Sequence, residues 1–197
     1  IGRQVTINEP YGIALDVSSQ TMYWTDYAMH RIRSVQTDGT LQDDIFIDGL
    51  YYPIGIKVDS KAGKLYWIKS YNSKKIRRAN LDGSNVEDLV VTGLNYPRGL
   101  ALDLVSRKMY WVDQGNGTIK NADFDGSNVH DITPSGVKNP GYIAIDANNQ
   151  KVYWTDYGTK KIQRSNMDGT NLEDLVVEDL ATPGGIALDT INENLYW

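Results

Sequence analysis

The stretch Tyr23-Trp24-Thr25-Asp26 is one copy of a motif that recurs along the whole chain. Further Tyr-Trp pairs end at Trp67, Trp111, Trp154 and Trp197, so the five tryptophans are 43, 44, 43 and 43 residues apart. A proline keeps the same period, at Pro10, Pro53, Pro97, Pro140 and Pro183, and Asp-Gly pairs follow in step. Three markers with one period of 40–45 residues predict a tandem array of similar structural units.

Each unit is predicted to contain four short strands. An extended apolar segment follows the proline (Gly12–Asp16 in the first unit), and a second segment ends in the Tyr-Trp pair. Lys75–Asn80 represents the third segment, which an Asp-Gly turn closes, and Asp88–Val91 represents the fourth. Because no long segment has the period of a helix, the sequence predicts an all-β fold.

The sizes of the side chains indicate how these sheets pack. Neighbouring residues of a strand point to opposite faces, so each Tyr-Trp pair places one large ring on either face and requires a sheet on both sides. A small residue recurs in the first strand, where converging sheets would crowd, at Ala14, Ala101, Ala144 and Ala187. These features predict a β-propeller of four-stranded antiparallel blades, with an open solenoid of sheets as the alternative.

The repeat boundaries are predicted at residues 10–52, 53–96, 97–139 and 140–182, with a partial repeat at 183–197, all within one propeller domain of residues 1–197. A segment that resembles an outer strand, Arg3–Ile7, precedes them. Six blades of this period need about 260 residues, so we expect the sequence to be a fragment of a six-bladed ring. A closed five-bladed ring, in which the terminal strands share one blade, is the alternative.

Composition excludes several classes of function. The chain has 20 Lys and Arg against 25 Asp and Glu, a net charge of −5, which argues against nucleic-acid binding. It has no cysteine, so disulfides and thiolate metal sites are excluded. No apolar run approaches about 18 residues, so we expect no direct insertion into a membrane. Nucleophile elbows, phosphate-binding loops and HExxH motifs are missing, and we predict neither a cofactor nor catalytic residues.

Aspartates that recur once per unit are predicted to belong to the scaffold, where they accept hydrogen bonds at turns and strand ends. One set comprises Asp16, Asp59, Asp103, Asp146 and Asp189, and the other comprises Asp26, Asp113 and Asp156. We predict no metal site among them. The two histidines, His30 and His130, lie a hundred residues apart. His30 follows the first Tyr-Trp-Thr-Asp and is either an ordinary loop residue or a pH-responsive contact.

The order Pro-x-Gly-Ile-Ala-x-Asp, Tyr-Trp-Thr-Asp, Asp-Gly resembles the YWTD family, also called low-density lipoprotein receptor class B repeats, over essentially all 197 residues. That family forms six-bladed propellers in lipoprotein receptors, Wnt co-receptors, the EGF precursor and nidogen. The resemblance implies an extracellular platform that binds a protein or peptide and is not an enzyme. It also implies that EGF-like modules flank the propeller in the full protein.

Loops in which the repeats differ are the places to expect a binding surface, because they vary at little cost to packing. A tyrosine-rich set with one arginine is typical of protein-binding hot spots. The predicted ligand-binding residues are Tyr11, Tyr27, Tyr52, Tyr71, Tyr96, Arg98, Gln114 and Tyr157. The resemblance to Wnt co-receptors implies Tyr27, Arg98 and Tyr157 in particular. The alternative is that these tyrosines only pack against prolines and neighbouring blades.

The second repeat differs from the others in charge. Between Lys57 and Arg78 there are eight basic residues and one acid. We predict a basic sector there that contacts an acidic partner, with a solvated outer face as the alternative. The sector comprises Lys57, Lys69, Lys74, Lys75, Arg77 and Arg78. Lys69 also replaces the aspartate that follows the tryptophan, and Tyr142 replaces a glycine of the repeat.

The sequence therefore predicts an extracellular binding module of a receptor or matrix protein. Two other functions are possible for such a fold: a hydrolase of the lactonase or esterase type with a metal in a central channel, and a structural propeller that only spaces its neighbours. Asn116-Gly117-Thr118 is an acceptor for N-glycosylation, which predicts a glycoprotein if the chain is secreted.

Overall fold

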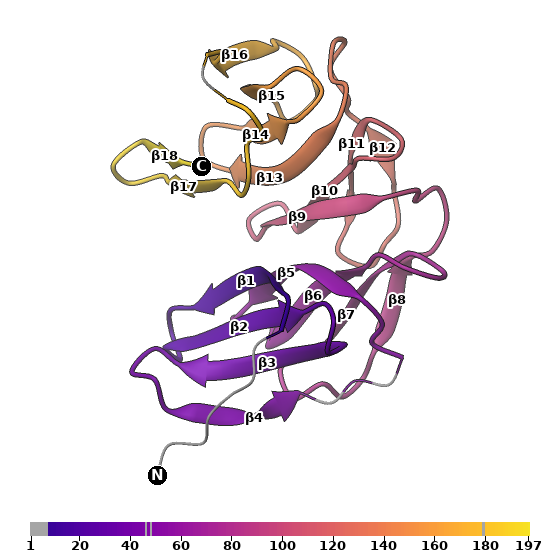
Figure 1. Ribbon diagram of the computed structural model, residues 1–197, viewed down its shortest axis with the longest axis vertical. Coiled ribbons are helices and arrows are strands. Elements are labelled where there is room, and N and C mark those ends of the chain that lie inside the picture. The colour runs from indigo at the N-terminus through magenta and orange to yellow at the C-terminus, as the bar shows by residue number, and fades with distance from the viewer. Residues whose placement is uncertain (1–7, 46, 48, 179) are drawn as a thin grey trace. The chain divides into compact units, whose positions relative to one another are not determined.

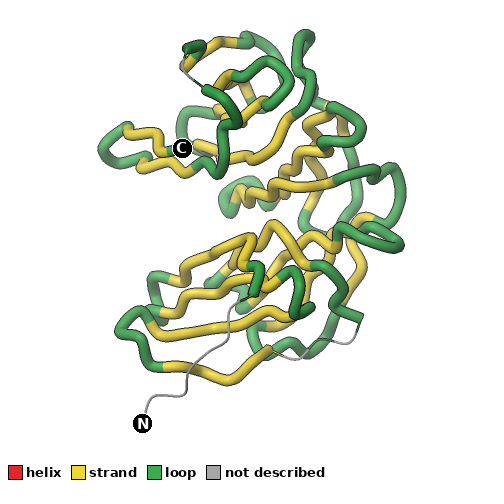
Figure 2. The backbone as a smooth tube through the Cα atoms, viewed as in Figure 1, coloured by secondary structure: helices red, strands yellow, loops and turns green. Residues whose placement is uncertain are grey.

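The computed structural model describes residues 8–45, 47, 49–178 and 180–197 (Figure 1). The regular structure in these ranges consists of strands, without a helix (Figure 2). Consequently, nothing in the described part of the chain is a helix able to cross a membrane. The predicted segment Arg3–Ile7 lies outside the described residues. The chain divides into two compact units, residues 1–92 and 93–197, which we describe separately.

The first unit contains two antiparallel sheets of four strands, each in simple sequential order. The first sheet consists of β1 (Pro10–Asp16), β2 (Thr21–Asp26), β3 (Arg31–Gln36) and β4 (Leu41–Ile45). The second consists of β5 (Pro53–Asp59), β6 (Lys64–Lys69), β7 (Lys75–Asn80) and β8 (Glu87–Val90). β1 and β2 both contact β5, so the two sheets pack against each other.

The second unit repeats this arrangement. Its first sheet consists of β9 (Pro97–Asp103), β10 (Lys108–Asp113), β11 (Thr118–Asp123) and β12 (His130–Asp131), and β12 is only two residues long. Its second sheet consists of β13 (Pro140–Asp146), β14 (Lys151–Asp156), β15 (Lys161–Asn166) and β16 (Glu173–Val176). A hairpin of β17 (Ala187–Asp189) and β18 (Asn194–Tyr196) follows, and β13 contacts both β9 and β17.

The predicted four-stranded antiparallel unit is confirmed, with corrections to its second and fourth strands. The second strand continues two residues beyond the Tyr-Trp pair, because Thr25 and Asp26 pair with Ile32 and Arg31 of β3. The third strand, Lys75–Asn80, has the predicted bounds. The fourth strand of the second repeat lies one residue earlier than predicted, at Glu87–Val90.

Both faces of the central strands are buried, as the Tyr-Trp pairs predict. Trp67, Trp111 and Trp154 are at most 1% exposed. Trp24 is half-buried and Trp197 is 57% exposed. In the first unit, Ala14 and Tyr23 of one sheet share a core with Ile56, Leu65 and Trp67 of the other. An equivalent core in the second unit contains Ala101, Tyr110, Val152 and Trp154. The small alanine of the inner strand therefore lies where the next sheet packs.

The recurring aspartates at the end of the first strand have the predicted scaffold role. Asp103 illustrates it, since its Oδ1 accepts the backbone N–H groups of Val105 (2.9 Å) and Ser106 (3.0 Å) in the following turn. Asp16, Asp59, Asp146 and Asp189 make bonds of the same kind. Burial raises the pKa of Asp16, but hydrogen bonds from Ser18, Ser60 and Ser19 outweigh it and hold that pKa well below its usual range.

Candidate binding surfaces

The aspartate that ends the Tyr-Trp-x-Asp motif holds together the two loops on which the predicted binding residues lie. Asp156 is fully buried, and its carboxylate accepts the N–H groups of Lys138 (2.8 Å) and Asn139 (3.1 Å), just before β13. It also accepts those of Gly158 and Thr159, both at 2.9 Å, just after β14. One buried carboxylate thus fixes the loop before the proline against the loop after the motif, and Asp26 and Asp113 act alike.

The second repeat replaces this anchor. Lys69 occupies the aspartate position and its side chain lies over the ring of Tyr51, 5.3 Å from the centroid. The buried Ser70 takes over the connection between the loops, because its Oγ donates to the carbonyl oxygen of Tyr52 at 2.9 Å. The loop at residues 70–73 is therefore shaped differently from its counterparts. Asn72 and Ser73 both have positive φ angles there, which non-glycine residues seldom adopt.

Four of the predicted tyrosines lie side by side in the first unit, and we call them the tyrosine row. The ring centroids of Tyr11 and Tyr27 are 6.0 Å apart, those of Tyr27 and Tyr52 are 4.7 Å apart, and those of Tyr52 and Tyr71 are 4.9 Å apart. These are tilted and edge-on contacts, the geometry that aromatic pairs prefer. The row starts in β1 and ends in the loop after β6, so it joins both sheets of the unit.

His30 extends the tyrosine row to Tyr51. Its ring lies edge-on to Tyr52, with 4.3 Å between centroids, and 5.7 Å from Tyr51. Its Nδ1 accepts the backbone N–H of Tyr52 at 3.1 Å. Both residues have positive φ, 56° for His30 and 50° for Tyr52. This bond holds the Tyr52 backbone in a conformation that it would rarely adopt otherwise.

The other four predicted residues belong to the second unit, where three of them form what we call the arginine cluster. The Arg98 guanidinium lies 5.3 Å from the ring centroids of both Tyr142 and Tyr157, and its Nη1 donates to Oε1 of Gln114 at 3.2 Å. Tyr96 is 45% exposed. Burial raises the pKa of Tyr157, partly offset by the positive charge of Arg98.

Tyr142, a member of this cluster, was not among the predicted binding residues. The signal for it was its substitution for a glycine of the repeat. A second departure explains how Tyr157 fits: the residue after Pro140 is Gly141, where a Cβ atom would lie 2.4 Å from the Tyr157 ring. Only glycine leaves room for the ring over that backbone. The cluster is therefore packed as well as polar, in line with the alternative that these tyrosines contribute to packing.

Three of the six residues of the basic sector are paired with two acids that lie just beyond its boundary in the sequence. Asp88 of β8 pairs with Lys75 and with Arg77 (2.7 Å), and Glu87 pairs with Arg78 (2.7 Å). Lys69 contacts Tyr51, and burial lowers its pKa as well as that of Lys57. Lys74 precedes β7 at the edge of the sector. Within β7, the cations of the sector thus form ion pairs with the acids of β8.

Acids of the described residues do not gather into a metal-binding group, since no three His, Asp or Glu side chains among them are arranged to hold an ion. The buried carboxylates that sequence inspection singles out are occupied with backbone N–H groups.

Comparison with protein families identifies the repeat. Residues 150–190 match the low-density lipoprotein receptor repeat class B. Among curated proteins, low-density lipoprotein receptor-related protein 5 of Mus musculus is 33% identical over 63 residues, which is 31% of this chain and 4% of that protein. The match thus covers only a small part of the length of this relative.

Solved structures show the fold. A chain in the crystal structure of a nidogen/laminin complex superposes with a TM-score of 0.87 and 27% identity, over 95% of this chain and 70% of that one. A streptogramin B lyase superposes with a TM-score of 0.74, and virginiamycin B lyase from Staphylococcus aureus with 0.71, each at 20% identity and over 60% of its chain. They cover 94% and 91% of this chain, respectively, and at that identity they show the likeness of fold alone.

The order of strands, the Tyr-Trp period and these matches agree on one architecture, with four complete blades and a partial fifth among the described residues. The predicted propeller and the predicted resemblance are both confirmed. The chain has the fold of a β-propeller, and its residues 150–190 are similar to the low-density lipoprotein receptor class B (YWTD) repeat.

Proposed function

We propose that this protein is an extracellular, non-enzymatic module that binds a protein or peptide segment through the tyrosine row and the adjoining His30. The observation that carries the proposal is the continuous series of ring contacts from Tyr11 to Tyr71 across two sheets. Tyr71, at the end of the row, and Tyr51, which His30 connects to it, are 52% and 53% accessible to solvent. These tyrosines are not among the residues that recur in every repeat, so the scaffold does not explain them.

The physical reason is the way in which tyrosine binds. A tyrosine ring contributes a large contact area with only two rotatable bonds, and its hydroxyl serves as donor or acceptor at the rim. Rings that pack on one another lose little further freedom when a partner covers them. Lys69, over the ring of Tyr51, adds one positive charge at the edge. These features suit an extended segment with apolar side chains and an acidic residue.

Two kinds of comparison support this proposal. The structure that superposes over 95% of the chain comes from a complex of nidogen with laminin, and the mouse relative is named as a lipoprotein receptor-related protein. Both favour a partner that is itself a protein, at the cell surface or in the matrix. The EGF-like modules beside the propeller are proposed from the family resemblance alone. Asn116 of the proposed glycosylation site is exposed in the turn between β10 and β11.

The competing functions find less support. A hydrolase would need acids free to bind a metal, whereas Asp26, Asp113 and Asp156 are committed to backbone N–H groups. A structural spacer would not need the exposed rings of Tyr51 and Tyr71. An acidic partner at the basic sector would compete with Glu87 and Asp88 for the same cations. The tyrosine row presents exposed aromatic surface instead.

The test is a selection of random peptides on immobilised protein, followed by affinity measurements on the variant Y51A/Y71A. Both rings end in solvent, so the variant should keep the parent's melting temperature while the selected peptides bind at least about tenfold more weakly. Tyr96→Ala is the matched control, since it removes a ring of similar exposure (45%) from the second unit. Failure to enrich any peptide, or equal affinity for parent and Y51A/Y71A, contradicts the proposal.

A further inference from the structure

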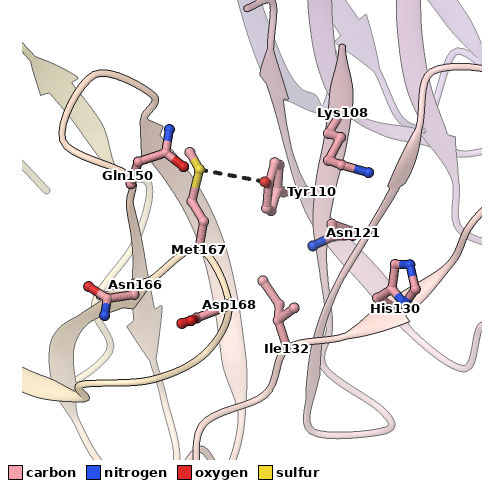
Figure 3. Close-up of a pocket in the computed structure, with 9 residues that line it drawn as sticks. All are labelled: Lys108, Tyr110, Asn121, His130, Ile132, Gln150, Asn166, Met167 and Asp168. Carbon is pink, nitrogen blue, oxygen red and sulfur yellow. Dashed lines mark hydrogen bonds between the residues drawn. The ribbon is translucent and has the colours of Figure 1, made fainter. Parts of the chain in front are cut away.

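A groove of about 740 Å³ in the second unit lies between the sheet of β9–β12 and the sheet of β13–β16 (Figure 3). Its lining includes Lys108, Tyr110, Asn121 and His130 from the first of these sheets, and Met167 and Asp168 from the turn after β15. None of these residues belongs to the arginine cluster. The groove is therefore a separate feature, to which the proposed function assigns no role.

The registers of the strands show why a groove exists here. In three sheets, the tyrosine of the Tyr-Trp pair faces a residue of the third strand, which in turn faces a residue of the fourth. The three sets are Tyr66, Arg78 and Glu87; Tyr153, Arg164 and Glu173; and Tyr110, Asn121 and His130. The sheet of β9–β12 thus has the short Asn121 and the imidazole of His130 where the other two have an arginine and a glutamate.

The arginine of a neighbouring sheet shows how that space is filled in two of the four complete sheets, whereas the first sheet has Ser34 opposite Tyr23. The guanidinium of Arg164 lies 5.9 Å from the ring centroid of Tyr153, and its Nη1 donates to the Tyr153 hydroxyl at 3.4 Å. The same guanidinium donates to Glu173 at 2.6 and 3.0 Å. A lysine, Lys151, accompanies this arrangement. Lys108 begins β10 as Lys151 begins β14. An arginine over the ring of Tyr110 is therefore compatible with a lysine at this position.

Replacing the arginine leaves polar groups of the groove poorly satisfied. The Tyr110 hydroxyl has the Met167 sulfur as its partner at 3.5 Å, and a thioether is a weak acceptor (Figure 3). Burial raises the pKa of Tyr110 to about 12, so its hydroxyl stays protonated at physiological pH. Asn121 is only 7% exposed, and its Oδ1 has no hydrogen-bond partner among the described residues. A buried amide oxygen without a partner can gain a hydrogen bond from a donor that enters the groove once the amide turns toward it.

Charge decides which guest the groove would accept. The second unit has 9 Lys and Arg against 14 Asp and Glu, so it carries the whole net charge of −5. Lys108, a cation in the lining, is already paired with Asp123 at 2.5 Å. The exposed Asp168 brings a carboxylate whose Oδ1 accepts from Thr170, which leaves Oδ2 for a guest. A cationic guest is favoured over an anionic one.

We propose that this groove is a socket for an arginine side chain of a protein partner. The guest guanidinium would lie over the ring of Tyr110 as Arg164 lies over that of Tyr153. It would donate to the amide oxygen of Asn121, which a half-turn about χ2 brings to the groove side, and to the carboxylate of Asp168. Its planar set of five donors suits two such acceptors better than the single ammonium of lysine does.

The first experiment uses N-acetyl-arginine methylamide as the probe and follows the side-chain amide signals of Asn121 by NMR in the whole chain. These signals should shift and saturate at millimolar probe, and N-acetyl-lysine methylamide should bind at least about fivefold more weakly. Y51A/Y71A should bind the arginine probe as the parent does, which separates this site from the tyrosine row. Shifts that favour N-acetyl-glutamate methylamide, or no saturable shift, would overturn the proposal.

Two variants give independent tests. N121R/H130E rebuilds the arginine–glutamate pair of the neighbouring sheets inside the groove, so it should abolish probe binding without lowering the melting temperature. Asp168→Asn keeps the turn, because an amide oxygen also accepts from Thr170, but removes the charge, and should weaken binding about three- to tenfold. Asp38→Asn is the matched control, being in an identical Asp-Gly-Thr turn outside the groove. Equal effects of Asp168→Asn and Asp38→Asn, or unchanged binding by a folded N121R/H130E, would refute the socket.

Discussion

The buried carboxylate of Asp156 offers the sharpest test of how the scaffold positions its loops. In Asp156→Asn, the amide oxygen can keep the bonds from Asn139, Gly158 and Thr159, but the new NH2 group then faces the N–H of Lys138, previously bound at 2.8 Å. One charge-assisted bond is lost and a buried donor is left opposite another donor. Such a change costs about 2–4 kcal/mol of unfolding free energy.

For a chain of this length, that loss corresponds to a fall of roughly 5–15 °C in melting temperature. The assay is urea denaturation followed by tryptophan fluorescence, with thermal unfolding by calorimetry as a check. Asp125→Asn is the matched control, because one oxygen of that exposed carboxylate accepts both bonds from Ser127 and an amide oxygen can keep both. A urea midpoint for Asp156→Asn equal to that of Asp125→Asn would refute the anchoring role.

Two further predictions concern charge. Hydrogen bonds from Arg78 and Arg164 lower the pKa of Glu87 and Glu173, so both carboxylates stabilise the folded state above the ordinary glutamate pKa, and this stabilisation is lost as pH falls through the lowered values. The urea concentration at the midpoint of unfolding should therefore decrease as the pH falls below about 4, and it should decrease less steeply in E87Q/E173Q. Equal pH dependence of the midpoint in the parent and in E87Q/E173Q would contradict this. Asp88→Asn should free two cations of the basic sector and increase the salt needed to elute the protein from heparin, whereas Asp174→Asn, which frees one lysine, should do so less; equal shifts would argue against the sector.

Features that depend on the period of the repeat were predictable from the sequence. The third strand at Lys75–Asn80, the burial of Trp67 on the face opposite Tyr66 and the turn bonds of Asp103 all follow from local chemistry repeated in each unit. Periodic residues face the same surroundings in every blade, so each copy of the pattern supports the same inference. This is why four-stranded sheets were predicted with nearly correct bounds.

Contacts between residues on different strands or different blades were not predictable in this way. The ion pairs of Asp88 with Lys75 and Arg77 join residues 11 to 13 apart, and a count of charges that stopped at Arg78 left that acid out. Likewise, the contact of Arg98 with Tyr142 joins two blades, and nothing in either segment alone indicates it. Pairing across a sheet, and not composition along it, decides which charges remain available.

The departures from the repeat carry the functional information. A position that is the same in every blade is explained by the blade, as Asp103 and its equivalents show. Where a blade differs, the structure has changed in one of two ways. At Lys69 and Ser70, a second residue restores the lost connection and the loop takes a new shape beside the tyrosine row. At Asn121, nothing among the described residues restores the missing partner, and a buried polar atom remains. The first pattern reshapes a surface, and the second leaves a vacancy that a partner's side chain can fill.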